Sequence, residues 1–227
     1  MRQLFFLLLL CLINPVFAYQ VEPMISHIDT LGANNRISYR VINTSNQKLP
    51  LEVAVMRRTF DAQGKEKLTP AEDDFLVLPP QTTVAPGQYQ MFRAQYIGPP
   101  VMAESASYRI IFKQLALQGK EKVSSVKMLF NFATLVMVSP QDVEGNLQTS
   151  VNCQAEECLM TMTNTGSGVV SLLEGELSIN GKTAADWETL QNIIPASYLM
   201  PSQEVSFSLG SLIETTDSVS SATYHLQ

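Results

Sequence analysis

The sequence is poor in the residues on which most catalytic and metal sites depend. It contains only two histidines, His27 and His225, one tryptophan and three cysteines among 227 residues. It has no Gly-x-Ser-x-Gly turn, no Gly-x-x-x-x-Gly-Lys phosphate loop and no evident cluster of metal ligands. The acidic run Glu72-Asp73-Asp74 is expected to form a solvated turn. These absences favour a binding protein over an enzyme and predict neither a metal nor a cofactor.

Basic residues are also in the minority. The chain has 15 Lys and Arg against 21 Asp and Glu, which gives a formal net charge of −6. An acidic chain is a poor match for phosphate backbones, so we expect no nucleic-acid partner. Apolar residues make up 45% of the chain, which is enough for a packed core and excludes disorder as the overall state.

The first residues have the pattern of a targeting signal. Arg2 supplies a positive charge, residues 5–13 are an unbroken apolar run, and an Asn-Pro pair then leads to Ala18. The run is too short to span a bilayer, which takes about 20 residues. We therefore predict that residues 1–18 are a signal peptide and that the mature chain begins at Tyr19. The alternative is an uncleaved anchor. No later segment is long and apolar enough for a membrane helix, so the mature chain is expected not to insert into a membrane.

Two of the three cysteines remain after Cys11 is assigned to the signal. Cys153 and Cys158 are an even pair in an exported chain, which predicts a disulfide across the tip of a hairpin. A structural zinc site would need four ligands, and both histidines lie far away in sequence. Closing so small a loop contributes about 2 kcal/mol, so the bond is expected to stabilise a hairpin and not the whole fold.

Helix signals are scarce, whereas short segments with apolar residues at every second position are common. Residues 37–41, 51–55 and 108–112 show this pattern, and turn-forming residues separate the segments. Many short strands at regular spacing predict an all-β protein built from sandwiches. A short helical turn is expected at 184–190, and the Ser- and Thr-rich tail after Glu214 is expected to be loose.

One run is longer than an ordinary strand. Residues 123–138 contain almost no breakers, although most strands have about 5–6 residues. Val126, Met128, Phe130, Phe132, Thr134, Val136 and Val138 would share one face, and Lys127, Leu129, Asn131, Ala133, Leu135 and Met137 the other. We expect such a strand to extend beyond its own sheet. The alternative is a central core strand with an ordinary mixed second face.

A domain boundary is expected where this run ends at Pro140. We predict a first domain over 19–139 and a second over 142–227. In the second, residues 147–151 and 159–163 are expected to pair across the cysteine hairpin, and the Asn-Gly pair that follows Ile179 is a hairpin-turn signal.

Several motifs appear in an order that is characteristic of a known family. They are Phe75-Leu76-Val77-Leu78-Pro79-Pro80, Pro86-Gly87-Gln88-Tyr89-Gln90-Met91-Phe92-Arg93, Tyr96-Ile97-Gly98-Pro99, Tyr108-Arg109-Ile110-Ile111-Phe112, Asn164-x-Gly166 and Tyr198-Leu199-Met200-Pro201. Together they resemble the periplasmic pilus-assembly chaperones of Gram-negative bacteria, which act in the chaperone–usher pathway. The chain looks closer to the alternative fimbrial branches than to the P-pilus branch.

The resemblance implies two immunoglobulin-like β-sandwich domains arranged as a boomerang around a subunit-binding cleft. In this family the last strand of the first domain, called G1, is lent to an incomplete pilin, which is then delivered to an outer-membrane usher. A donated strand satisfies the open edge of the pilin, and its alternating apolar side chains fill the pilin's groove. The donor residues implied here are Val123, Val126, Met128, Phe130 and Phe132.

The family's cleft also holds basic residues that anchor the terminal carboxylate of the pilin. One is usually an Arg or Lys on the first strand, and the other is a Lys on G1. Lys127 is the candidate on the long run, but residues 22–28 carry no Arg or Lys, which leaves His27 on the first strand. A histidine there would be mostly neutral at pH 7. Arg109 is a further candidate, and Arg40, Arg57 and Arg58 are other possible cations.

Two other functions remain open from the sequence. A pilin or adhesin would use the long strand for its own assembly, but a pilin is usually a single incomplete sandwich, whereas this chain has strands for two. A secreted sandwich enzyme or sugar-binding domain is disfavoured by the missing motifs and the single tryptophan.

Overall fold

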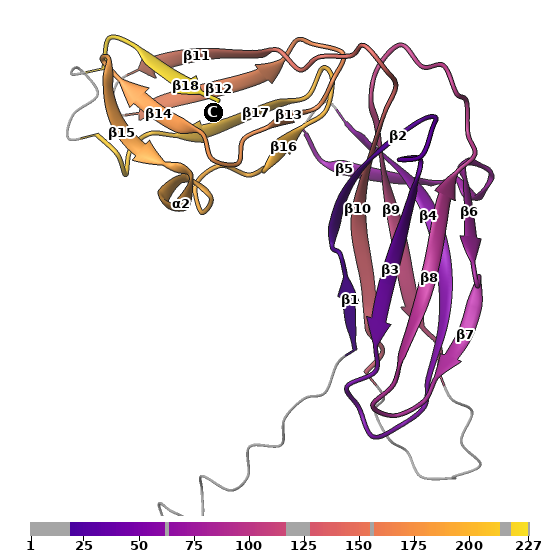
Figure 1. The fold of residues 1–227 in the computed structure, drawn as a ribbon. Coiled ribbons are helices and arrows are strands. Elements are labelled where there is room, and N and C mark those ends of the chain that lie inside the picture. Colours follow the sequence, from indigo (N-terminus) through magenta and orange to yellow (C-terminus); the bar gives the residue numbers. More distant parts are fainter. Residues whose placement is uncertain (1–18, 62–63, 117–127, 155–156, 214–218, 227) are drawn as a thin grey trace, which may run out of the picture.

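The computed structural model describes residues 19–61, 64–116, 128–154, 157–213 and 219–226. It consists of two β-sandwich domains set at a wide angle to each other (Figure 1). The predicted class, all-β with two immunoglobulin-like domains in a boomerang arrangement, is confirmed. Among the described residues, no helix is both long and apolar enough to cross a bilayer.

Two sheets face each other in the first domain. The smaller sheet has the order β1 (Gln20–Glu22), β3 (Arg36–Ile42), β8 (Tyr89–Tyr96) and β6 (Phe75–Leu78). The larger has the order β2 (Ile25–Asp29), β10 (Asn131–Ser139), β9 (Ala106–Gln114), β4 (Leu49–Phe60) and β5 (Glu66–Pro70), and β7 (Gln81–Val84) also pairs with β4. The acidic run Glu72–Asp74 forms a 3₁₀ turn with no buried residue, as expected for a solvated turn.

The core between these sheets follows the period-two pattern of the sequence. In β3, Tyr39 and Val41 are fully buried while Ser38 and Arg40 are exposed. The ring of Phe112 meets Tyr39 and Phe92 edge to face, with centroids 5.3 and 5.1 Å apart. This geometry is the one that aromatic quadrupoles favour. The alternating residues therefore build one aromatic layer from both sheets.

The second domain is made of three small sheets. They are β11 (Leu147–Gln154), β12 (Glu157–Asn164) and β17 (Glu204–Ser208); β13 (Val170–Ser171) and β16 (Tyr198–Leu199); and β15 (Lys182–Asp186), β14 (Glu176–Ile179) and β18 (Ala222–His225). The predicted Asn180-Gly181 turn joins β14 to β15 with both residues at positive φ. The expected helical turn is α2 (Trp187–Leu190), whose first turn is capped by the Asp186 carboxylate accepting from Thr189 N at 3.0 Å.

A buried asparagine ties a loop to the sheet in each domain. The Asn164 amide donates to the carbonyls of Gly168 and Leu199 at 2.8 and 3.0 Å. The Asn43 amide donates likewise to the carbonyls of Gln47 and Val84 at 2.7 and 3.0 Å. Both side chains are at most 1% exposed, so these bonds satisfy backbone groups that water does not reach.

Two expectations from the sequence were wrong. The long run is not one strand from residue 123, because residues 128–130 lie outside any strand and β10 begins at Asn131. The ladder stops there because its partner β9 ends at Gln114. The tail after Glu214 is not loose throughout, since β18 pairs with β14 and buries Ala222 and Tyr224 in the second core.

The two cores are separate clusters on either side of the segment between β10 and β11. β10 ends at Ser139 and β11 begins at Leu147. One backbone hydrogen bond between the domains runs from Ser105 N to Ser167 O at 2.9 Å. The boundary at residues 140–142 remains a prediction.

Candidate functional site

β10 offers an open backbone edge near the start of the strand. Along its whole length it pairs antiparallel with β9, from Asn131 opposite Lys113 to Val138 opposite Ala106. On its other side, the parallel strand β2 pairs only with residues 135–139. Within the part of the chain that the structure describes, residues 131–134 thus have a ladder partner on one side only. Unpaired strand edges of this kind accept a further strand.

The predicted donor residues fall into three environments. Val123 and Val126 lie outside the described residues. Met128 is 71% exposed and lies three residues before the start of β10. Phe130 and Phe132 are half-buried and pack against the first core. The reason is that they continue the inward face of β10, on which Thr134, Val136 and Val138 are fully buried.

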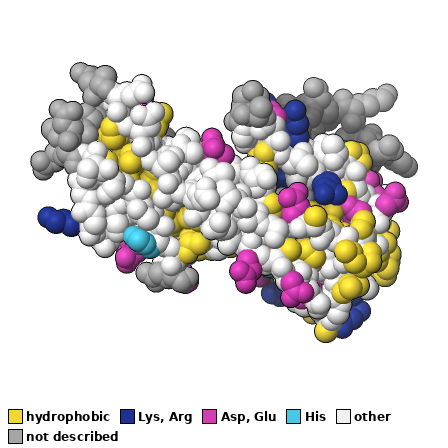
Figure 2. Space-filling view, turned by 90° about the horizontal axis from the view of Figure 1, so that it is seen from above, with side chains coloured by type: hydrophobic (Ala, Val, Ile, Leu, Met, Phe, Trp, Pro, Cys, Tyr) yellow, Lys and Arg dark blue, Asp and Glu magenta, His cyan; other side chains and the backbone are white. Residues whose placement is uncertain are grey.

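Exposed apolar side chains are concentrated in the first domain. Of the large apolar residues exposed in the described part of the chain, only Leu159, Leu173 and Leu226 belong to the second. Figure 2 shows apolar side chains gathered over the first domain, on the right, with smaller apolar patches on the visible face of the second. The surface best suited to bind another polypeptide is therefore on the first domain.

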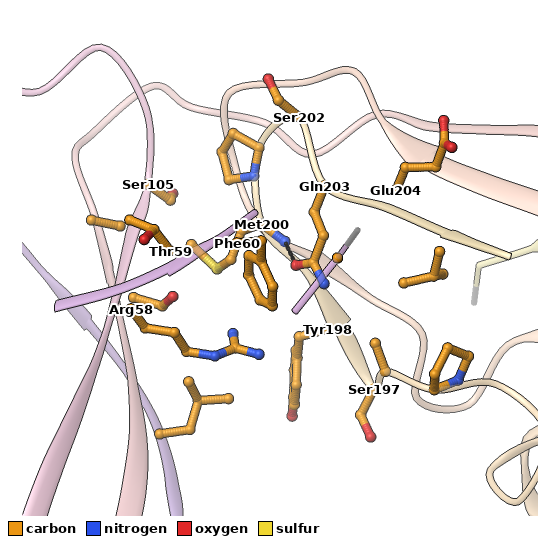
Figure 3. A pocket seen from close by; sticks show the side chains of 18 of the residues that line it. Arg58, Thr59, Phe60, Ser105, Ser197, Tyr198, Met200, Ser202, Gln203 and Glu204 are labelled. Atoms are coloured by element: carbon orange, nitrogen blue, oxygen red, sulfur yellow. Dashed lines mark hydrogen bonds between the residues drawn. The ribbon is translucent and has the colours of Figure 1, made fainter. Parts of the chain in front are cut away.

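A cleft of about 1030 Å³ lies between the domains. One wall is the outer face of the larger first-domain sheet, with Ile25, Leu135, Ser107 and Arg58, and the other is the segment 195–206 of the second domain. In Figure 3, Arg58 points toward Tyr198 across this space, beside Phe60. Within the segment 195–206, the Gln203 side-chain oxygen accepts a hydrogen bond from Met200 N at 3.0 Å.

Three charged residues form a network on this face of the sheet. Glu66 accepts from Arg58 Nε at 2.5 Å and from Arg109 Nη2 and Nε at 2.7 and 3.2 Å. Burial alone would raise the pKa of Glu66, but hydrogen bonds and charge from Arg109 and Arg58 outweigh it and lower the pKa below its usual 4.5. Two guanidinium groups around one carboxylate give this network one net positive charge, while Asp61, Glu104 and Glu204 also line the cleft.

The hydroxyl groups of Ser105 and Ser107 line the cleft next to this network. Ser139 Oγ lies 2.6 Å from His27 Nε2 and 2.7 Å from Ser105 Oγ. Burial lowers the pKa of His27, and the nearby Asp29 carboxylate opposes this shift only partly. Ser107 is 2% exposed, and its Oγ has no hydrogen-bond partner in the structure. Donors for an acceptor group of a ligand are therefore available here.

The two predicted carboxylate anchors that the structure describes, His27 and Arg109, lie on different strands. Lys127 lies outside the described residues. His27 is on the edge strand β2, and Arg109 is on β9 with its guanidinium bonded to Glu66. Registers place Ile25, Leu135 and Arg109 in one row across β2, β10 and β9, with Arg58 and Ser107 paired in the next row.

Arg58 was only one of several possible cations in the sequence. Its position beside Arg109 and Glu66 depends on the pairing of β4 with β9, which no local sequence pattern reveals. The signal available from the sequence was the Arg57-Arg58 pair within a strand pattern, and this does not show which of the two bonds to Glu66.

The predicted disulfide is present between Cys153 and Cys158, which face each other in the β11–β12 hairpin. It belongs to the second domain and does not line the cleft. No group of three or more His, Cys, Asp or Glu residues within the described ranges is arranged to hold a metal ion.

Comparison with known proteins agrees with this geometry. The profile of the family described as "Pili and flagellar-assembly chaperone, PapD N-terminal domain" matches residues 23–144. No curated protein matches the chain. The SafB chaperone of Salmonella enterica, solved with the SafA pilin, superposes with a TM-score of 0.59 at 13% identity, covering 94% of this chain and 98% of that one.

Two further solved structures share the fold. The structure of the CsuC–CsuE chaperone–tip subunit pre-assembly complex from Acinetobacter baumannii gives a TM-score of 0.56 at 15% identity and covers 84% of this chain and 87% of that one. The E. coli chaperone DraB gives 0.56 at 16% identity, with 85% of both chains covered.

Proposed function

Since the chain belongs to the family of pili and flagellar-assembly chaperones, we propose that it binds incomplete pilus subunits in the periplasm and delivers them to an outer-membrane usher. The observation that carries this proposal is the open edge of β10, which runs directly into the exposed Met128. Residues 1–18, the predicted signal peptide, would direct the chain to that compartment and be removed after Ala18.

The open edge explains how a subunit would be held. A pilin that lacks a strand has unpaired backbone groups beside its groove, and the free edge of residues 131–134 can pair with one row of them. Val123, Val126 and Met128 would fill the groove with apolar side chains. Phe130 and Phe132 already contact the first core, so they would be shared between the chaperone's core and that of the pilin.

The arginine network suits the other part of a subunit, its terminal carboxylate. Arg58 uses Nε for Glu66 and directs the rest of its guanidinium into the cleft. A guanidinium binds a carboxylate through two parallel N–H bonds, and a hydrogen bond to a charged group contributes about 1.5–3 kcal/mol. We assign Arg58 as the main anchor, with Arg109 adding charge and Glu66 holding both side chains in place. His27 and Lys127 would have lesser roles.

The test is co-expression of the chain with a candidate pilin from the same source. A soluble one-to-one complex, detected by size-exclusion chromatography with light scattering, is expected. Arg58→Gln should reduce recovery of pilin, whereas Arg93→Gln, which changes an exposed arginine on the opposite sheet, should not. Absence of any complex with the wild-type chain would refute the proposed function.

A second experiment tests the role of the pilin's terminal carboxylate. A pilin extended by two residues at its C-terminus should bind the wild-type chain more weakly than the native pilin, since its carboxylate is displaced from Arg58. The same extension should change little for Arg58→Gln. If the extension weakens both to the same degree, Arg58 is not the anchor. Polymers of the chain itself without pilin would instead favour a structural subunit, which the comparisons do not support.

A further inference from the structure

Tyr19 joins three parts of the first domain at the point where β10 begins. It is 3% exposed, immediately before β1. Its hydroxyl group donates to the carbonyl of Phe112 on β9, at 2.5 Å, and lies 3.1 Å from the carbonyl of Phe130. Its ring meets that of Phe132 edge to face, with centroids 4.6 Å apart. One side chain thus contacts both strands of the ladder and the segment that leads into it.

Gln114 holds the same segment from the other strand. Its backbone N–H donates to Phe130 O at 3.2 Å, and its side-chain carbonyl accepts from Phe130 N at 3.1 Å. Phe130 therefore has both backbone groups bonded although it lies outside the strand. Two residues further out, Met128 is mostly exposed. Hydrogen bonding to β9 therefore extends to Phe130, and Met128 and Leu129 precede it outside any strand.

We propose that Tyr19, with Gln114, is a positioning residue for subunit binding. It holds the Phe130 backbone in strand register, so that Met128 leaves the sheet in the direction a pilin groove requires. This inference rests on the proposed function. Ordering a segment before binding reduces the entropy lost on association, so a residue that orders it raises affinity without touching the partner.

The chain offers a closely matched control. Tyr224 is likewise a buried tyrosine, 5% exposed, whose hydroxyl group donates to a backbone carbonyl, that of Leu172. It lies in the second domain, in β18. Tyr19→Phe and Tyr224→Phe each remove one hydroxyl group and keep the ring, so both should lower the melting temperature slightly and by similar amounts.

Of the two tyrosine variants, only Tyr19→Phe should affect residues 128–130, which lead into β10. Its Phe130 amide should exchange with solvent about five- to tenfold faster, the factor expected from the loss of one hydrogen bond. Recovery of a co-expressed pilin should fall as well. Gln114→Ala should have both effects through the other contact. Tyr224→Phe should exchange at the wild-type rate in this segment and recover pilin fully.

Three results would overturn the positioning role. These are an unchanged exchange rate at Phe130 in Tyr19→Phe, equal changes in both tyrosine variants, or full pilin recovery despite faster exchange. Failure of the wild-type chain to recover any pilin is a different result, because it would refute the proposed function itself. The two failures are thus distinguishable in one experiment.

Discussion

The variant Met128→Glu tests whether the Met128 side chain binds the pilin or stabilises the chain's own core. The Met128 side chain is 71% exposed and lies before the first residue of β10. A charge at such a position should leave the free energy of unfolding of the free chain within about 0.5 kcal/mol of wild type. Its effect should therefore appear only when a partner covers the residue.

The expected loss of affinity follows from the exposed area. Fully burying a methionine side chain is worth about 1.5–3 kcal/mol. Because 71% of that surface remains exposed, about 1–2 kcal/mol is left to be gained on binding. Losing it weakens binding about 5- to 30-fold, and the cost of desolvating a carboxylate in the groove adds to this loss.

Phe130→Glu is the informative contrast. Its ring is half-buried against the first core, so the charge should destabilise the free chain as well as the complex. Val101→Glu is the matched control, since Val101 is 84% exposed in the loop between β8 and β9 and should change neither property.

Thermal melts followed by circular dichroism, together with the yield of co-purified pilin, test these expectations. Met128→Glu should have the melting temperature of the wild type but a lower yield of co-purified pilin, whereas Phe130→Glu should melt at a lower temperature. The reasoning is refuted if Met128→Glu lowers the melting temperature as much as Phe130→Glu, or if it retains pilin as well as Val101→Glu does.

Three further predictions concern stability. Burial lowers the pKa of His27 below its usual 6.5, so the imidazole binds a proton more readily in the unfolded chain than in the folded one. The stability that this difference leaves intact above about pH 6.5 should therefore be lost as the pH falls below that value. His27→Gln should flatten this part of a plot of melting temperature against pH. Asn164→Ala leaves two buried carbonyls without a donor and should cost about 2–4 kcal/mol in urea unfolding, with a loss of under 0.5 kcal/mol contradicting the role of its bonds. Replacing Cys153 and Cys158 by Ser should cost about 2 kcal/mol and leave pilin recovery unchanged; reduced recovery would connect the hairpin to the site.

Features that depend on near neighbours in the chain were predictable from the sequence alone. The alternation at 37–41 places Tyr39 and Val41 in the core whatever they pack against, because a strand points successive side chains to opposite faces. Asn180-Gly181 turns a hairpin because both residues tolerate positive φ, and Cys153 and Cys158 are close enough in sequence to meet across one hairpin. The ordered motifs also led to the family, which residues 23–144 match.

The extent of β10 and the side chains that meet across the sheets depend instead on contacts between distant segments. β10 begins at Asn131 because β9, its partner, ends at Gln114, so the limit is set by another strand and not by the apolar run itself. Arg58, Glu66 and Arg109 meet because β4 pairs with both β5 and β9, and Tyr19 reaches Phe130 across 111 residues of sequence. Strand register is a property of pairs of distant segments, and a one-residue shift would move each of these side chains to the other face. The positions of the cations and of the donor segment were therefore not readable from any single stretch of the chain.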